Sequence, residues 1–198
     1  MRVELIKDFF KELDRSWRPS PAERIPLQII GSAALMLQAG YERGTKDSDI
    51  LETAALGGAV GEKLLSLAGK NSGLSKRYGI YLDIVKGGIP FLPAKPVFNA
   101  LPALAGLRNF EITALDVIDV AVSKLKRFTS NDAADIRAVA EKGLIDPGLL
   151  ASRFRAAVDA FSTDARAEDL PRYVKNLHTV ERDFLEVAES EIDLPGWV

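Results

Sequence analysis

Residues 26–52 read PLQIIGSAALMLQAGYERGTKDSDILE, and this stretch decides the fold. An apolar run ends in Gly31-Ser32, and a helical pattern follows as far as Gly40, which stands where a C-terminal cap is expected. Asp47-Ser48-Asp49 then opens a second apolar run. The order predicts strand, turn, helix and strand within this one stretch.

The turn and the aspartates suit a bound phosphate and its metal ion. Gly31 lets the backbone approach a phosphate, the helix N-terminus presents free amides, and Ser32 adds a hydroxyl donor. Residues two apart on a strand point the same way, with Cα atoms roughly 6.5–7 Å apart, so Asp47 and Asp49 can converge on one ion. Their oxygens suit Mg²⁺, and a second ion would complete a two-metal site.

A third carboxylate lies on residues 80–85 (IYLDIV), the clearest strand in the chain. Alternation places Asp83 on the face opposite Leu82. Burying a lone carboxylate in mid-strand is costly. Asp83 is therefore expected to face a cleft, as a metal ligand beside Asp47 and Asp49.

The rest of the N-terminal part supports this core. Residues 2–16 predict an amphipathic helix that lies on the sheet, and residues 107–113 predict an edge strand. Residues 69–79 (GKNSGLSKRYG) predict a basic loop, which is either ordinary solvated surface or a surface that steers a polyanion.

Beyond Ala114 the pattern becomes helical. Caps and periodicity predict helices over 116–128, 131–142, 147–161 and 168–189. The fold class is therefore α/β (α+β), with a small mixed sheet flanked by helices and a helical C-terminal part. We expect an α/β core over 1–113 and a helical part over 114–198, which either stands alone or packs on the core as one unit.

Composition narrows the class of protein. With 198 residues the chain can bury a proper core, and its formal charge of −2 gives no overall push towards nucleic acid or an anionic membrane. Without cysteine, disulfides and thiolate metal sites are excluded. The sequence shows neither a signal peptide nor a membrane span, so a cytoplasmic location without a membrane partner is expected. His178, the only histidine, is expected on the surface.

The ordered set of motifs resembles a known superfamily. Gly31-Ser32 followed by Arg43-x-Thr45-x-Asp47-x-Asp49-Ile50 resembles the signature of DNA polymerase β-like nucleotidyltransferases, and the R-x-T-x-D-x-D form resembles the AbiEii-like branch, toxins of type IV toxin–antitoxin systems. Asp119-Val-Ala-Val-Ser-Lys124-Leu-Lys-Arg127, then Asp132-Ala-Ala-Asp135-Ile136, is similar to that branch's lysine helix and D-x-x-D-I element. The resemblance covers roughly residues 26–140.

This resemblance implies a nucleotidyltransferase fold, magnesium (two ions in a complete site) and transfer of a nucleoside monophosphate (NMP) from a nucleoside triphosphate (NTP). It makes Asp47 and Asp49 metal ligands, lets Lys124 contact the phosphates, and gives Asp135 the task of orienting a basic or nucleotide-contacting group. The expected catalytic residues are Asp47, Asp49, Asp83 and Lys124. The expected nucleotide-binding residues are Gly31, Ser32, Arg43, Thr45, Lys124, Arg127 and Asp135.

Three functions remain open from the sequence. The first is an active, toxin-like enzyme that transfers the NMP to an acceptor hydroxyl or phosphate, on a tRNA end or a protein, and has a cognate antitoxin. The second is a nucleotide-binding or regulatory protein that keeps the fold without catalysis. The third is a small-molecule nucleotidyltransferase of the antibiotic-modifying kind. The intact aspartates favour an enzyme over the second, and the basic residues at 70–77 favour a polyanionic acceptor.

Overall fold

The chain folds into two compact units. The computed structural model describes residues 3–42, 44, 47–162, 165–194 and 196, with only the backbone at Asp47 and at 165–166. The first unit comprises 1–89 and 98–115, and the second comprises 90–97 and 116–198. The boundary thus falls after Leu115 rather than after residue 113, and the segment 90–97 belongs to the helical unit.

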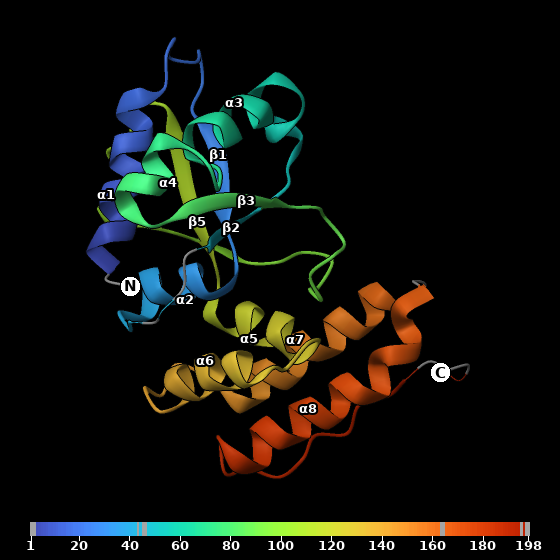
Figure 1. Cartoon of the computed structure of the whole chain (residues 1–198). Helices are drawn as coiled ribbons and strands as arrows, with labels where there is room; N and C mark the ends of the chain where they lie inside the picture. Colours follow the sequence, from blue (N-terminus) through green and yellow to red (C-terminus); the bar gives the residue numbers. More distant parts are fainter. Residues whose placement is uncertain (1–2, 43, 45–46, 163–164, 195, 197–198) are drawn as a thin grey trace. The chain divides into compact units, whose positions relative to one another are not determined.

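A five-stranded mixed sheet forms the centre of the first unit (Figure 1). Its strands are β1 (Ile25–Ile29), β2 (Asp47–Leu51), β3 (Tyr81–Val85), β4 (Phe98–Ala100) and β5 (Phe110–Leu115). They lie in the order β3-β2-β1-β5-β4. The β1–β5 and β2–β3 pairs are parallel, whereas β1–β2 and β4–β5 are antiparallel.

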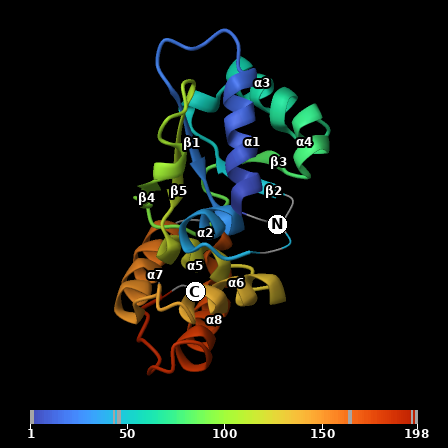
Figure 2. The same cartoon turned by 90° about the vertical axis from the view of Figure 1, so that its left-hand side faces the viewer.

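The helices of this unit give the sheet one buried face. They are α1 (Val3–Ser16), α2 (Gly31–Ala39), α3 (Ala59–Ala68) and α4 (Gly73–Tyr78), and α1, α3 and α4 lie side by side (Figures 1 and 2). Trp17, just after α1, packs edge-on against Phe110 of β5, and Gly61 of α3 lies against Ile84 of β3. Since Phe110 and Ile84 are on the same face by register, α1 and α3 both cover that face.

Two local predictions for this unit were wrong. β5 is not an edge strand, because the short strand β4 in the 87–106 connector pairs with its outer side. The basic segment 69–79 is not all loop: Ser72 caps α4 by accepting a hydrogen bond from the Ser75 amide at 3.0 Å, and the helix continues to Tyr78.

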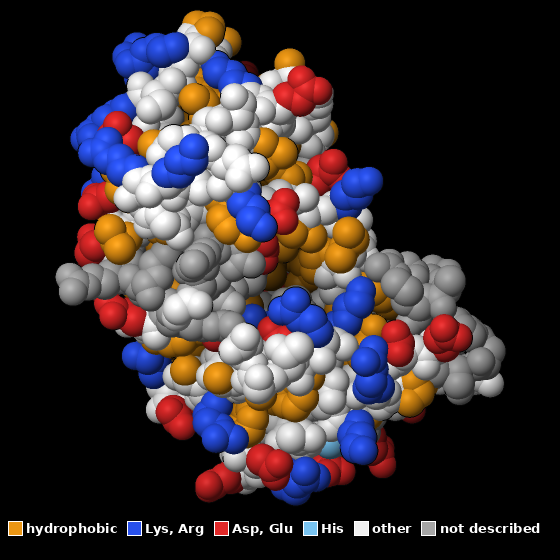
Figure 3. All heavy atoms as spheres, viewed as in Figure 1, with side chains coloured by type: hydrophobic (Ala, Val, Ile, Leu, Met, Phe, Trp, Pro, Cys, Tyr) orange, Lys and Arg blue, Asp and Glu red, His pale blue; other side chains and the backbone are white. Residues whose placement is uncertain are grey.

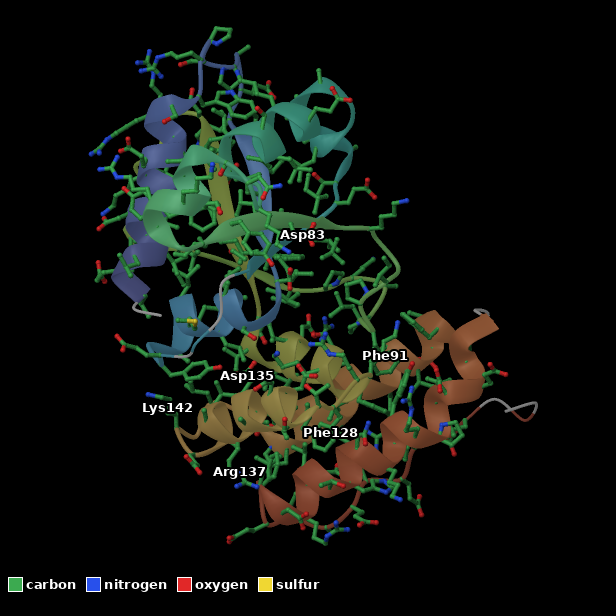
Figure 4. The ribbon with its side chains drawn as sticks, in the orientation of Figure 1. Asp83, Phe91, Phe128, Asp135, Arg137 and Lys142 are labelled. Carbon is green, nitrogen blue, oxygen red and sulfur yellow. The ribbon has the colours of Figure 1, made fainter. Side chains whose placement is uncertain are left out.

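The second unit is made of α5 (Val117–Leu125), α6 (Ser130–Ala140), α7 (Pro147–Phe161) and α8 (Leu170–Asp183). The segment 90–97 joins it because the buried Phe91 ring (Figure 4) makes edge-on contacts at 5.1–5.3 Å with aromatic rings of α7 and α8. A mixed sheet flanked by helices and followed by a helical part confirms the predicted α/β (α+β) class and is consistent with a nucleotidyltransferase fold.

The last helix is shorter than the sequence predicted. It ends at Asp183 instead of continuing to residue 189, because the chain turns back and Ser190 donates its amide to the buried Glu181 carboxylate at 3.0 Å. His178 is consequently not a fully exposed surface residue: its side chain is 26% exposed, and Nε2 lies 3.1 Å from the Ser190 carbonyl oxygen. Within the described ranges, none of the helices has the length and apolar character needed to cross a membrane.

Candidate functional site

The turn between β1 and α2 lies directly on a carboxylate of β2. Gly31 has φ +65°, and a Cβ added there would meet Asp49 Oδ2 at 3.2 Å. The Ile30 amide donates to the Asp49 carbonyl oxygen at 2.9 Å, which ties the turn to the strand. The N-cap residue of α2, Ile30, makes no side-chain hydrogen bond to the first turn of the helix. The glycine is therefore required by both the backbone angle and the close approach.

Asp49 and Asp83 lie side by side on neighbouring parallel strands. They are register partners in the β2–β3 pair, and such strands are about 4.8 Å apart. Ser48 and Leu82, which alternate with them, are buried on the face covered by helices. The two carboxylates therefore project from the opposite face, where Asp49 is half-buried and Asp83 is exposed.

The structure describes little of three other predicted residues of the sheet unit. Arg43 and Thr45 lie outside the described residues, and so does the side chain of Asp47, although its backbone begins β2. Ser32 lies in the first turn of α2, because the helix begins at Gly31 and not, as predicted, after the Gly31-Ser32 pair. The structure thus brings Gly31, Asp49 and Asp83 together.

The donor chemistry of this face fits a hard divalent cation. Carboxylate oxygens are preferred Mg²⁺ ligands, and the ion keeps several water or phosphate oxygens of its own. Like charges directly opposite each other on neighbouring strands repel, so a cation beside Asp49 and Asp83 would relieve that repulsion. Among the described side chains no group of three His, Cys, Asp or Glu is placed to hold a metal; the Asp47 carboxylate is outside that set.

The predicted residues of the helical unit form a buried ion-pair network. Lys124 of α5 is only 7% exposed, and its Nζ lies 2.7 Å from Asp135 Oδ2 and 3.2 Å from Asp132 Oδ1. Arg127, whose side chain is exposed, donates to both Asp132 oxygens at 3.0 and 3.1 Å. Lys124 is thus no solvated surface lysine. Its closer carboxylate partner, Asp135, is labelled on α6 in Figure 4.

Asp132 also closes the N-terminus of α6. Thr129 is the N-cap and Asp132 the third helical residue of a capping box, in which each side chain bonds the other's backbone amide. Burial alone would raise the pKa of Asp132, but the Arg127 hydrogen bond and the Lys124 charge outweigh it and hold that pKa far below its ordinary value. The carboxylate is therefore ionised throughout the physiological range.

This lowered pKa predicts acid sensitivity. A group whose pKa is lower in the folded state stabilises the fold above its unfolded pKa, and that contribution is lost as the pH falls towards the folded value. We expect wild type to be more stable than Asp132→Asn at neutral pH, with the gap narrowing from about pH 5 to about pH 2. Urea unfolding of both proteins across that range measures it. Parallel pH profiles would contradict the assignment.

Sequence reasoning missed two features here. The T-x-x-D spacing from Thr129 is a capping-box signal, and it would have placed the helix start before residue 131. The buried Asp119 carboxylate receives two hydrogen bonds from Arg153 of α7, at 2.7 and 2.6 Å, and one from the Val97 amide at 2.8 Å. No local pattern signals that pair, because its members are far apart in the chain.

One of three comparisons with known proteins found a match. The model of a family described as "Nucleotidyltransferase of unknown function (DUF6036)" matches residues 8–184. The chain belongs to this family. The match runs from within α1 to the end of α8, so it includes residues of both units. No match was found among curated proteins or among solved structures.

Membership supports the nucleotidyltransferase part of the resemblance to polymerase β-like enzymes. The family description names nucleotidyl transfer and gives no substrate, metal or acceptor.

Proposed function

We propose that the protein is a Mg²⁺-dependent nucleotidyltransferase that moves an NMP from an NTP to an acceptor hydroxyl. The observation that carries this is the contact of the Gly31 turn with Asp49, which stands in register with Asp83. The N-terminus of α2, which would bind phosphate, and the two carboxylates, which would bind the metal, then meet at Asp49. Family membership supports the reaction class.

In this proposal the chain's residues bind and orient the donor. The first-turn amides of α2 bind phosphate oxygens, and Gly31 allows the close approach. Asp49 and Asp83, with Asp47 on the same strand, hold Mg²⁺, which when bound neutralises charge on the reacting phosphoryl group. A bond forms between the acceptor oxygen and the α-phosphorus, the bond to the bridging oxygen breaks, and pyrophosphate leaves while the hydroxyl proton is released. Lys124 as a phosphate contact stays a prediction.

The proposal extends to the branch of the superfamily and to the kind of acceptor. The R-x-T-x-D-x-D sequence and the Lys124-to-Asp135 motif favour an AbiEii-like, toxin-type enzyme with a cognate antitoxin. A small adjacent reading frame encoding a regulator would support that assignment. An antibiotic-modifying enzyme shares the donor chemistry and differs only in its acceptor.

The direct test uses the full chain with Mg²⁺ and each of the four labelled NTPs, together with total RNA or lysate. We expect label in one macromolecular fraction, and loss of labelling when EDTA is added. Nucleotide binding without label in any fraction, small molecules included, would instead indicate a catalytically silent regulator and contradict the proposal.

Gly31→Ala is expected to lower activity by more than its effect on stability explains. Gly31 and Gly40 have similar positive φ angles, +65° and +61°, so alanine at either costs roughly 1–2 kcal/mol of stability. Only at Gly31 does the added Cβ press on Asp49, since nothing lies within 4 Å of one at Gly40. Labelling rates should fall at least about tenfold in Gly31→Ala, a barrier of 1.4 kcal/mol, and stay near wild type in Gly40→Ala. Equal rates in both folded variants would argue against a catalytic role for this turn.

A further inference from the structure

A cavity of about 490 Å³ lies along the free edge of β3, inside the sheet unit. The last turn of α3, the connection from α3 to α4 and the strand itself form its walls. Its volume is in the range of clefts that hold small organic ligands. Its polar lining consists of Ser66, Lys70, Asn71, Ser72, Tyr81 and Asp83.

Asp83 connects this cavity to the proposed metal-binding face. It lines the cavity and is also the register partner of Asp49. Because β3 is an edge strand, the cavity and the carboxylate pair meet at the same strand (Figure 4 labels Asp83). A molecule in the cavity would therefore lie next to Asp83, on the opposite side of β3 from β2 and the Gly31 turn.

The lining chemistry selects a planar, negatively charged ligand. Lys70 Nζ lies 6.0 Å from the centre of the half-buried Tyr81 ring, so an aromatic face and a cation are presented together. The exposed Asn71 amide can both donate and accept hydrogen bonds. Figure 3 shows basic, acidic and hydrophobic side chains adjoining over β3. Aromatic side chains stack on nucleobases and lysines pair with phosphates, so this set matches a nucleotide.

We propose that this cavity is the acceptor subsite and takes one nucleotide unit with a free hydroxyl, from an RNA end or as a free nucleotide. Its base lies against Tyr81, its phosphate near Lys70, and its hydroxyl towards Asp83. The assignment rests on the proposed function, because only a transferase needs an acceptor beside these carboxylates. An acceptor hydroxyl on a protein would bring neither a base for the Tyr81 ring nor a phosphate for Lys70.

The test measures acceptor binding without the donor. A short, 5′-phosphorylated, fluorescent single-stranded RNA is titrated with the full chain, and anisotropy gives the dissociation constant. Tyr81→Leu and Lys70→Ala should each weaken binding about tenfold, the order expected for loss of one stacked base or one phosphate contact. Lys76→Ala is the matched control, since Lys76 is exposed on α4 and does not line the cavity. Competition by a mononucleotide then distinguishes the two sources: equal affinity identifies a free nucleotide, weaker affinity an RNA end.

The two proposals fail in different ways. Equal losses in Lys70→Ala and Lys76→Ala without an effect of Tyr81→Leu would show general charge attraction and overturn the subsite, as would no binding of either ligand. Asp49→Asn should keep the RNA affinity while losing NTP-dependent labelling. If labelling survives in Asp49→Asn, the proposed function is wrong. If labelling is lost in Asp49→Asn but the RNA affinity is unchanged in Tyr81→Leu and Lys70→Ala, only the acceptor subsite is wrong.

Discussion

Asp49→Asn is expected to lower NTP-dependent labelling by at least about 10²–10³-fold, the order of effect of losing one strong electrostatic contact in a transition state. The amide is nearly the same shape as the carboxylate, but it carries no charge and is a poor Mg²⁺ ligand. The rate is measured with labelled NTP and the responsive fraction of lysate. Thermal unfolding checks that the variant remains folded.

Glu52→Gln is the matched control for Asp49→Asn. Glu52 follows β2 directly, is exposed, and undergoes the same change in charge. Its variant should label at the wild-type rate. If labelling falls equally in both variants, the loss comes from the change in overall charge around the sheet, and Asp49 has no special role.

Lys124→Met is expected to lower the free energy of unfolding by about 3–5 kcal/mol, the range for removing one partner of a buried ion pair. Lys124 contacts two carboxylates that are 1% exposed, and its loss leaves Asp135 without its 2.7 Å cationic partner. Asp132 keeps Arg127, so the damage should centre on Asp135. Urea unfolding of the full chain measures the effect.

A double variant and a surface control test whether the stability loss comes from the buried ion pair. Adding Asp135→Asn to Lys124→Met removes the buried charge that has lost its contact with Lys124, and it should restore part of the stability. Lys142→Met, at an exposed position (Figure 4), should change stability by no more than about 0.5 kcal/mol. A Lys124→Met effect as small as that of Lys142→Met would contradict a buried structural role for the network.

The sheet side of the candidate site could be predicted because its signals are local. Apolar runs, the Gly31-Ser32 punctuation and the D-x-D all lie within residues 26–52, and β1, α2 and β2 form there. Strand alternation likewise predicted an accessible Asp83. The sequence also predicted Asp83 beside Asp47 and Asp49, but only the strand register shows that Asp49 is its direct neighbour.

The remaining differences come from contacts between distant segments. Strand β4 makes β5 internal, and Phe91 carries the segment 90–97 into the helical unit by packing on aromatic residues of α7 and α8. The burial of Lys124 depends on how α5 meets α6. Periodicity predicted the helix α5, although over 116–128 instead of Val117–Leu125, and it gave no indication of which polar side chains face a neighbouring helix.

Metal binding by the β2–β3 carboxylates is the central claim, and it can be measured without turnover. Mn²⁺ is titrated into the full chain with a non-hydrolysable NTP analogue present, and electron paramagnetic resonance follows the free ion. We expect wild type and Glu52→Gln to bind Mn²⁺ with similar affinity, and Asp49→Asn to bind it at least about tenfold more weakly, a loss of 1.4 kcal/mol. Equal Mn²⁺ affinity in Asp49→Asn and wild type would contradict the account.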